Sequence, residues 1–204
     1  IRDSPILAPA ERLAVWAVQR RFSPGADVTL FLGLTGLRWG EFVALRPCDL
    51  LATTTGRPMV HIARSIVRAR GAGPPTVKST KTGAARMVPL AHLAADIAES
   101  WASDTDRQSL LVPGPDGSSL RPSTFRRQAH WTQTVPAGFR IHDLRHTAVS
   151  LWIASGANPK QVAALAGHTS VSVVLDRYGH LYPQQDLDLR AAMERHHQRQ
   201  PVAD

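Results

Sequence analysis

The sequence predicts a mainly α-helical domain with a small antiparallel β-sheet, an α+β architecture. Helical patterns occupy both ends of the chain, whereas short segments rich in β-branched residues are confined to its middle. Strands and helices do not alternate, which argues against a doubly wound parallel sheet. A length of 204 residues and a hydrophobic content of 43% suffice for one domain, or two small ones, with a substantial core.

Three helices are expected before the first strand. Residues 9–21 carry apolar side chains at helical spacing, and FSPG ends this helix. Residues 26–36 are nearly all apolar, which indicates a buried helix with Asp27 as its N-cap. RWGEFVALR, at residues 38–46, predicts a third helix that stops at the following proline.

The middle of the chain predicts the antiparallel sheet. Its strands are MVHIARSIV, PTVKST and ARMVPL, at residues 59–67, 75–80 and 85–90. Lys81 lies in the KTG turn between the last two strands, so a hairpin would present its ammonium group at the tip. KTG also occurs in penicillin-binding enzymes, but no lysine here has the serine three residues before it that those enzymes require.

The helical period returns after the last strand. The expected helices span residues 91–103, 123–133, 143–155, 159–167, 170–179 and, as a charged tail helix, about 185–200. The single cysteine, Cys48, cannot form an internal disulfide, which is typical of a reducing cytoplasm, and it is interpreted as a packing residue. No apolar run reaches 18 residues and no signal-peptide pattern is present, so no membrane span is expected.

The charge balance favours a polyanionic partner. The formal net charge is +8, and only three of the 24 basic residues are lysines. Because arginine grips phosphate oxygens with two parallel donors, nucleic acid is the favoured partner. Arg126, Arg127 and Arg140 are the candidates for contacts to the DNA backbone.

Residues 35–41, TGLRWGE, place an arginine where a helix begins. Gly36 permits a sharp turn, and Arg38 follows in the first helical turn, where free N–H groups favour anions. Glu41 lies three residues further along the same face and can orient Arg38. Taken alone, the motif is better explained as a surface ion pair between Arg38 and Glu41.

Residues 140–152, RIHDLRHTAVSLW, place His142 and Arg145 on one side of a helical first turn. His142 and His146 have the spacing of a zinc-binding pair. No acidic third ligand follows at a typical offset, however, and Arg145 between them would repel a cation, so no metal site is predicted.

Residues 164–181, ALAGHTSVSVVLDRYGHL, contain a predicted helix C-cap at Gly167, followed directly by His168. Tyr178 ends the next short helix. A tyrosine beside a glycine is commonly a half-buried phenol, and a turn lysine such as Lys81 is commonly solvated. None of these motifs identifies a function by itself.

Together, TGLRWGE, KSTKTG…RMVPL, HDLRHT and AGHTSVSVVLDRYGH resemble the catalytic domain of the tyrosine recombinases, or phage integrase family, over residues 9–182. The resemblance implies site-specific DNA recombination through a 3′-phosphotyrosyl intermediate and strand transfer, independent of metal ions, ATP and cofactors. The implied catalytic residues are Arg38, Lys81, His142, Arg145, His168 and Tyr178, supported by Glu41 and His146.

The resemblance also assigns the roles. Arg38 and Arg145 would bind the scissile phosphate from two sides, and Tyr178 would attack the phosphorus. His142 or a nearby group would accept the phenol proton, and Lys81 would protonate the leaving 5′ oxygen.

The implied partner is double-stranded DNA, on which the protein would assemble as a tetramer, with accessory DNA-bending factors as further candidates. A bacterial, cytoplasmic and nucleoid-associated location follows. Residues 1–8 are expected to be a linker, and residues 183–204 a tail that either packs on a neighbouring protomer or is solvated, with a disordered end. The family's N-terminal core-binding domain is expected to be absent from this chain. The alternatives are DNA relaxation like that of type IB topoisomerases, and a non-catalytic DNA-binding relic of the same fold.

Overall fold

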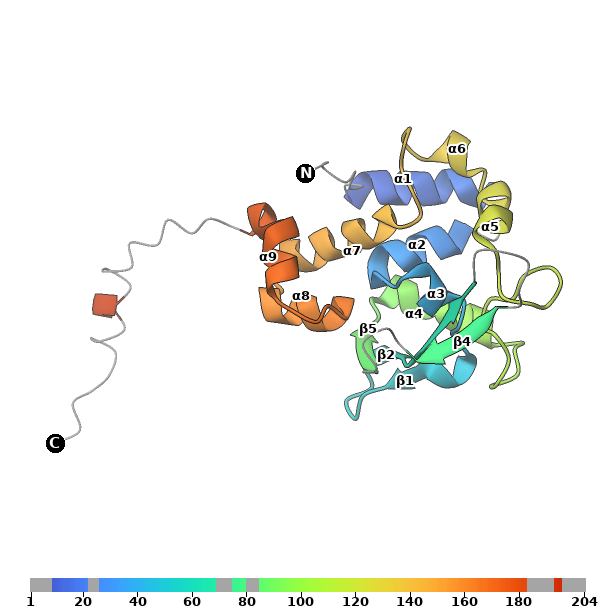
Figure 1. Cartoon of the computed structure of the whole chain (residues 1–204), viewed down its shortest axis with the longest axis horizontal. Coiled ribbons are helices and arrows are strands. Elements are labelled where there is room, and N and C mark those ends of the chain that lie inside the picture. Colours follow the sequence, from blue (N-terminus) through green and yellow to red (C-terminus); the bar gives the residue numbers. More distant parts are fainter. Residues whose placement is uncertain (1–8, 22–25, 69–74, 80–84, 183–192, 196–204) are drawn as a thin grey trace.

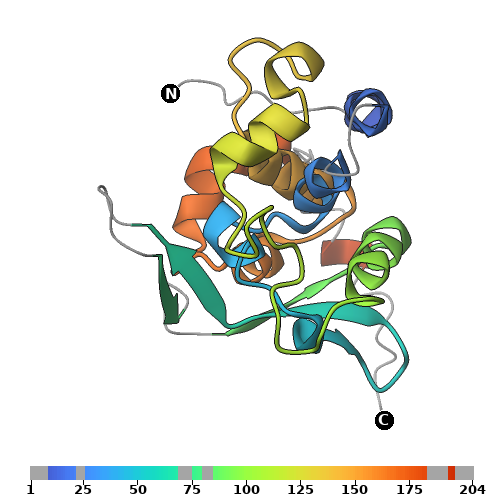
Figure 2. The ribbon, with the colours of Figure 1, turned by 90° about the vertical axis from the view of Figure 1, so that its right-hand side faces the viewer.

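The computed structural model describes residues 9–21, 26–68, 75–79, 85–182 and 193–195, in which helices form the body and two small sheets lie along one side (Figures 1 and 2). The elements are α1 (Pro9–Arg20), α2 (Ala26–Thr35), α3 (Trp39–Phe42), η1 (Pro47–Asp49), β1 (Leu50–Ala52), β2 (Pro58–Ile62), β3 (Arg64–Val67), β4 (Thr76–Ser79), β5 (Arg86–Pro89), α4 (His92–Ala102), α5 (Pro122–Gln128), α6 (Trp131–Thr134), α7 (Asp143–Ala154), α8 (Pro159–Ala166), α9 (Ser172–Tyr178) and η2 (Gly179–Leu181). The predicted mainly α, α+β class is confirmed.

Helix α7 runs through the centre of the molecule and packs against α2. All of its residues from 143 to 149 are buried, polar ones included. Leu144 and Ala148 lie in the core, whereas Leu151 and Trp152 are only partly buried. Because polar side chains on this helix cannot reach water, they must find partners inside the protein.

The strands form two antiparallel sheets, where the sequence predicted one. One sheet has the order β1-β2-β5, and the other pairs β3 with β4. The predicted strand at 59–67 is split, because β2 ends at Ile62 and β3 begins at Arg64. Residues 80–85 join β4 to β5, which pair with different strands, so the prediction of a hairpin around Lys81 was wrong. Lys81 itself lies outside the described residues.

Three further local expectations were wrong. Helix α3 ends at Phe42, well before the predicted end at 46, and Arg38 is its N-cap. The predicted helix at 123–133 is divided into α5 and α6 by His130, whose φ of 46° is left-handed and cannot continue a helix. Asp27 is not the N-cap of α2 but lies in its first turn. Its side chain accepts a hydrogen bond from the Trp16 indole at 2.8 Å and so joins α1 to α2.

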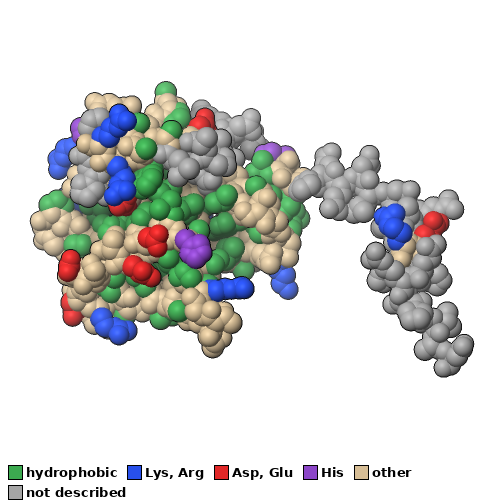
Figure 3. Space-filling model, turned by 180° about the vertical axis from the view of Figure 1, so that it is seen from behind, with side chains coloured by type: hydrophobic (Ala, Val, Ile, Leu, Met, Phe, Trp, Pro, Cys, Tyr) green, Lys and Arg blue, Asp and Glu red, His purple; other side chains and the backbone are tan. Residues whose placement is uncertain are grey.

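The surface is not uniformly basic. On the face seen from behind, acidic side chains lie beside apolar surface (Figure 3). A pocket between the three-stranded sheet and α4 is lined by both kinds, among them Leu51, Met59, Asp96 and Glu99. Carboxylates at this position would repel a phosphate backbone.

Other predictions concern segments at the ends of the chain. The predicted linker, residues 1–8, lies outside the described residues, as does the predicted tail except for residues 193–195, which are helical. Cys48 is half-buried and free, as the packing interpretation allows. Within the described part of the chain, no helix is both long and apolar enough to cross a membrane.

Candidate active site

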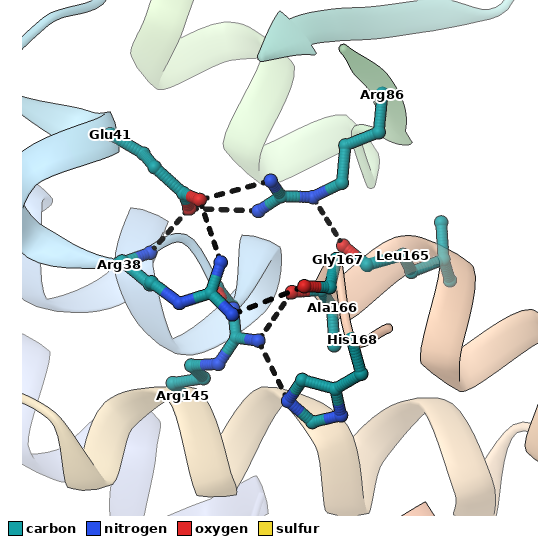
Figure 4. A network of polar contacts seen from close by, with 9 residues as sticks. Arg38, Glu41, Arg86, Arg145, Leu165, Ala166, Gly167 and His168 are labelled. Carbon is teal, nitrogen blue, oxygen red and sulfur yellow. Dashed lines mark hydrogen bonds and ion pairs between the residues drawn. The ribbon is translucent and has the colours of Figure 1, made fainter. Parts of the chain in front are cut away.

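Three arginines converge on the C-terminal end of α8, where three consecutive carbonyls each accept from a different one (Figure 4). The bonds are Arg86 Nε to Leu165 O (2.8 Å), Arg145 Nη2 to Ala166 O, and Arg38 Nη2 to Gly167 O (3.2 Å). The last carbonyls of a helix lack partners within the helix and form the negative end of its dipole. The end of α8 therefore holds guanidinium groups from α3, β5 and α7 together.

Local sequence fixes this end of α8. Asn158 and Gln161 form a capping box at the start of the helix, with both bonds at 2.9 Å. Gly167 ends the helix with φ 63° and ψ 45°, the left-handed conformation that glycine adopts most readily. A Cβ atom at Gly167 would stand 3.0 Å from Nη1 of Arg86, so the glycine also makes room for that arginine.

Among the described residues, Glu41 is the single carboxylate that binds these arginines, and its side chain is only 2% exposed. Its oxygens accept from Arg38 N (2.8 Å), Arg38 Nη1 (2.9 Å), Arg86 Nη1 (3.0 Å) and Arg86 Nη2 (2.8 Å). Burial pushes the pKa of Glu41 upward, but the hydrogen bonds and charges of Arg86 and Arg38 outweigh it and hold the pKa below its ordinary value. Glu41 is therefore a carboxylate at neutral pH.

Arg145 is 4% exposed and connects three segments of the chain. Nη1 donates to the carbonyl of Gly36 at 2.7 Å, and Nη2 lies 3.1 Å from Nε2 of His168. Burial, reinforced by the charge of Arg38, lowers the pKa of Arg145 to about 10, so the group remains a cation at neutral pH.

His168 is held in one tautomer by Arg145. Burial and the charge of Arg145 lower the pKa of His168 to about 4, so the ring is neutral at pH 7. Because a guanidinium can only donate, Nε2 is the acceptor and the proton lies on Nδ1. Nδ1 is buried and has no hydrogen-bond partner among the described residues. An unpaired buried N–H is unfavourable, and a ligand oxygen would relieve the cost.

Tyr178, at the end of α9, is 3% exposed, and its Oη lies 2.5 Å from Nδ1 of His146. Burial raises the pKa of Tyr178, although the charges of Arg145 and Arg177 oppose the rise. Burial and the charge of Arg177 lower the pKa of His146 to about 4. At neutral pH the contact thus joins a neutral phenol to a neutral imidazole.

His142 contacts His146, with ring centroids 5.3 Å apart and planes nearly perpendicular. Surrounding protein and the charge of Arg145 lower the pKa of His142. Although His142 and Arg145 are three residues apart, Arg145 is buried against α8 whereas His142 is exposed at the start of α7. The charge of Arg145 nevertheless acts on the pKa of His142, and a catalytic role for His142 stays a prediction.

The structure thus brings together most of the predicted residues in two adjoining groups. Arg38, Glu41, Arg145 and His168 share one hydrogen-bonded network, and His146 and Tyr178 form the other group. Arg145 and His146 are neighbours on α7, which joins the groups.

The predicted DNA-backbone arginines lie outside these groups. Arg126 and Arg127 are exposed on α5. Arg140 is 64% exposed but donates to both oxygens of Asp143 through Nε and Nη2, at 3.1 and 2.8 Å.

The sequence-based prediction gave Arg86 no role, although its guanidinium is central to the network. The sequence carried only a weak signal for such a role, because Arg86 begins a short strand whose other side chains are ordinary for a sheet. Within the described residues, no three His, Cys, Asp or Glu side chains are grouped so that they could hold a metal ion.

The fold matches solved structures of integrases. The Tn1549 transposon integrase in complex with a circular intermediate DNA superposes with a TM-score of 0.74 at 20% identity, covering 96% of this chain and 67% of that chain. The catalytic domain of bacteriophage HP1 integrase gives a TM-score of 0.63 at 18% identity, with 94% of both chains covered. The chain therefore has the fold of an integrase catalytic domain.

The sequence comparisons define the family. Residues 22–185 match the model of the phage integrase family, and the chain belongs to that family. Tyrosine recombinase XerC of Corynebacterium efficiens is 30% identical over 109 residues, 50% of this chain and 35% of XerC. A prophage phiRv2 integrase of Mycobacterium tuberculosis is 24% identical over 178 residues, 84% of this chain and 46% of the relative. The chain spans between a third and a half of the length of these curated relatives.

Proposed function

We propose that this chain is the catalytic domain of a site-specific DNA recombinase in which Tyr178 attacks a DNA phosphodiester. The observation that carries the proposal is the convergence of Arg38, Arg86 and Arg145 around a single carboxylate, Glu41. Three guanidinium cations and one carboxylate leave a net charge of +2 in a partly buried cluster. Such an excess suits a phosphodiester, whose equatorial oxygens gain negative charge as the nucleophile attacks.

Arg38 is the cluster's accessible phosphate donor. Its side chain is 33% exposed, and the two bonds to Glu41 and Gly167 leave N–H groups of the guanidinium free for an incoming oxygen. Arg145 contributes charge from a buried position and fixes the tautomer of His168. The unpaired Nδ1–H of His168 then supplies a further donor to the phosphate.

In the proposed cleavage step, the bond from Tyr178 Oη to phosphorus forms as the bond from phosphorus to the 5′ oxygen breaks. The phenol proton passes to Nδ1 of His146, which lies 2.5 Å away and is neutral at pH 7. A phenol is a far weaker acid than a histidine with a pKa of about 4, so the proton moves as the Oη–phosphorus bond forms. The leaving oxygen takes a proton from Lys81, a role that rests on the family resemblance.

The product is a 3′-phosphotyrosyl link, which a 5′-hydroxyl of a second strand then attacks to release Tyr178. Double-stranded DNA is the proposed partner, and two related structures support it, the Tn1549 integrase on circular intermediate DNA and the XerH recombinase bound to its difH substrate. We further propose that the protein assembles as a tetramer on DNA, with accessory bending factors, and that it acts in the bacterial nucleoid. Arg126 and Arg127 are the proposed contacts to the DNA backbone.

The proposal is tested by trapping the covalent intermediate. The purified chain is incubated with a library of nicked duplexes of randomised sequence. The nick lets the short fragment that carries the new 5′-hydroxyl diffuse away after cleavage, which prevents religation. SDS-resistant protein–DNA adducts are then isolated and sequenced. We expect adducts with the natural chain and none with Tyr178→Phe. Equal adduct yields from both proteins would refute the assignment, and plasmid relaxation by the chain alone would favour the topoisomerase-like alternative.

A further inference from the structure

Arg86 is chemically separate from the arginines that can face a phosphate. Its side chain is 10% exposed, and Nε, Nη1 and Nη2 all donate to protein acceptors. Arg38 likewise uses one bond from each of its Nη atoms, but its side chain is 33% exposed, so accessibility distinguishes the two arginines. Arg86 is therefore unsuited to contact the phosphate directly. Because burying a cation is costly, its contacts inside the cluster must compensate for that cost.

The carboxylate of Glu41 is the main partner of Arg86. Each oxygen accepts one bond from Arg38 and one from Arg86, which fills the four acceptor positions of a carboxylate. Without Arg86, a buried carboxylate would keep only its bonds from Arg38. The guanidinium of Arg38 would then form a bidentate pair with Glu41, because a buried carboxylate is stabilised by each further hydrogen bond that it accepts.

The third bond of Arg86 extends its effect to α8. Nε donates to the carbonyl of Leu165 at 2.8 Å, one residue before the carbonyl that binds Arg145 and two before the one that binds Arg38. A Cβ atom at Gly167 would stand 3.0 Å from Nη1 of Arg86, so a side chain there would require the Arg86 guanidinium to shift. Arg86 thus contacts both Glu41 and the segment that carries His168 (Figure 4).

We infer that Arg86 is a positioning residue for phosphodiester cleavage: by occupying Glu41 and the end of α8, it keeps Arg38 available to the phosphate. The inference rests on the proposed function. It assigns to Arg86 an effect on the rate of the covalent step rather than on DNA affinity, since the Arg86 side chain is only 10% exposed and donates to protein acceptors.

The test measures single-turnover adduct formation at saturating DNA, together with the dissociation constant, on a nicked duplex that the natural chain selects from the library. For Arg86→Met we expect a fall of about 10- to 100-fold in rate, less than the loss for removing a donor that touches the transition state, with the dissociation constant changed less than about threefold. Arg64→Met is the matched control. Arg64 also forms an ion pair with a buried carboxylate, Asp49, at 2.5 Å and outside the cluster, so its loss should leave the rate unchanged.

A second variant separates positioning from a merely structural role. In Glu41→Gln/Arg86→Met the buried negative charge is gone, so Arg38 is no longer drawn away, and the rate should recover about tenfold relative to Arg86→Met. A double variant as slow as or slower than Arg86→Met would overturn the inference, as would an unchanged rate for Arg86→Met itself. If the natural chain forms no adduct that depends on Tyr178, it is the proposed function that fails.

Discussion

At the scale of single residues, the site is built by matching donors to acceptors inside the protein. Arg38, Arg86 and Arg145 do not simply surround an empty space, since each already binds a carbonyl at the end of α8. Fixed donors cost no reorganisation when charge develops on a substrate, which is why such networks favour catalysis. The contact between Tyr178 and His146 follows the same logic for the proton.

Replacement of His146 tests the proton path. His146→Phe keeps an aromatic ring but removes Nδ1, so we expect adduct formation to slow by about 10²-fold or more, the usual contribution of a general base. His142→Phe should slow the reaction less, because His142 contacts the ring of His146 and has no hydrogen bond to Tyr178. Quenched-flow measurement of the single-turnover rate compares the two variants. The reverse ranking would assign the base to His142.

At the scale of elements, the turn between α2 and α3 shows how backbone conformation supports the site. Gly36 has φ 62°, its carbonyl accepts from Arg145, and a Cβ atom there would stand 2.7 Å from the ring of Trp152. Gly156, after α7, has φ 89° with open space around its Cα. The two glycines therefore share the strain of positive φ but differ in packing.

Alanine at these glycines should reveal that difference. Gly156→Ala should lower the free energy of unfolding by about 1 kcal/mol, the cost of a left-handed alanine. Gly36→Ala should lower it by about 1–3 kcal/mol more, because Trp152 must move, and should also slow adduct formation through Arg145. Urea denaturation measures both free energies. Equal losses would show that the close contact with Trp152 is without consequence.

Elements with a strong local pattern could be predicted from the sequence. The apolar run of α2, the C-cap at Gly167 and the start of α7 near His142 all follow from neighbouring residues. The split of α5 from α6 at His130 could not be predicted, because a non-glycine residue adopts a positive φ there. Which strands pair was equally hidden, since β5 joins β2 rather than the strand before it.

The site could be predicted only where motifs are local. Arg38 and Glu41 are three residues apart, and their contact is formed as expected. Arg86 lies 45 residues from Glu41 along the chain, and no spacing rule connects a strand to that helix. The pairing of Tyr178 with His146, rather than with the arginines, depends on where α9 packs and was likewise beyond local pattern.

At the scale of the whole molecule, buried neutral histidines link stability to pH. His146 and His168 have pKa values of about 4 in the folded chain, below the ordinary value of 6.5. Between pH 6.5 and 4 the unfolded chain therefore binds more protons than the folded chain. The contribution of these two histidines to the free energy of unfolding is fully present above pH 6.5 and is lost as the pH falls toward 4. The lowered pKa of His142 acts in the same direction.

We expect the free energy of unfolding to fall between pH 6.5 and 5 by up to about 1.4 kcal/mol per pH unit for each of the two histidines. Asparagine does not titrate in this range. In His146→Asn the slope of the unfolding free energy against pH should therefore be smaller by the contribution of one histidine. Thermal or urea unfolding at several pH values gives the slopes. A natural chain whose stability is flat over this window would contradict the buried, neutral state of these rings.

The most direct measurement of the central claim identifies the atom pair that is joined in the covalent intermediate. Adducts from the nicked duplex are digested with nuclease and protease, and the nucleotide-bearing peptide is sequenced by tandem mass spectrometry. The arrangement of Tyr178 beside His146 and the arginine cluster predicts a nucleotide attached through its 3′-phosphate to Tyr178. Attachment to any other residue, or a link through a 5′-phosphate, would contradict it.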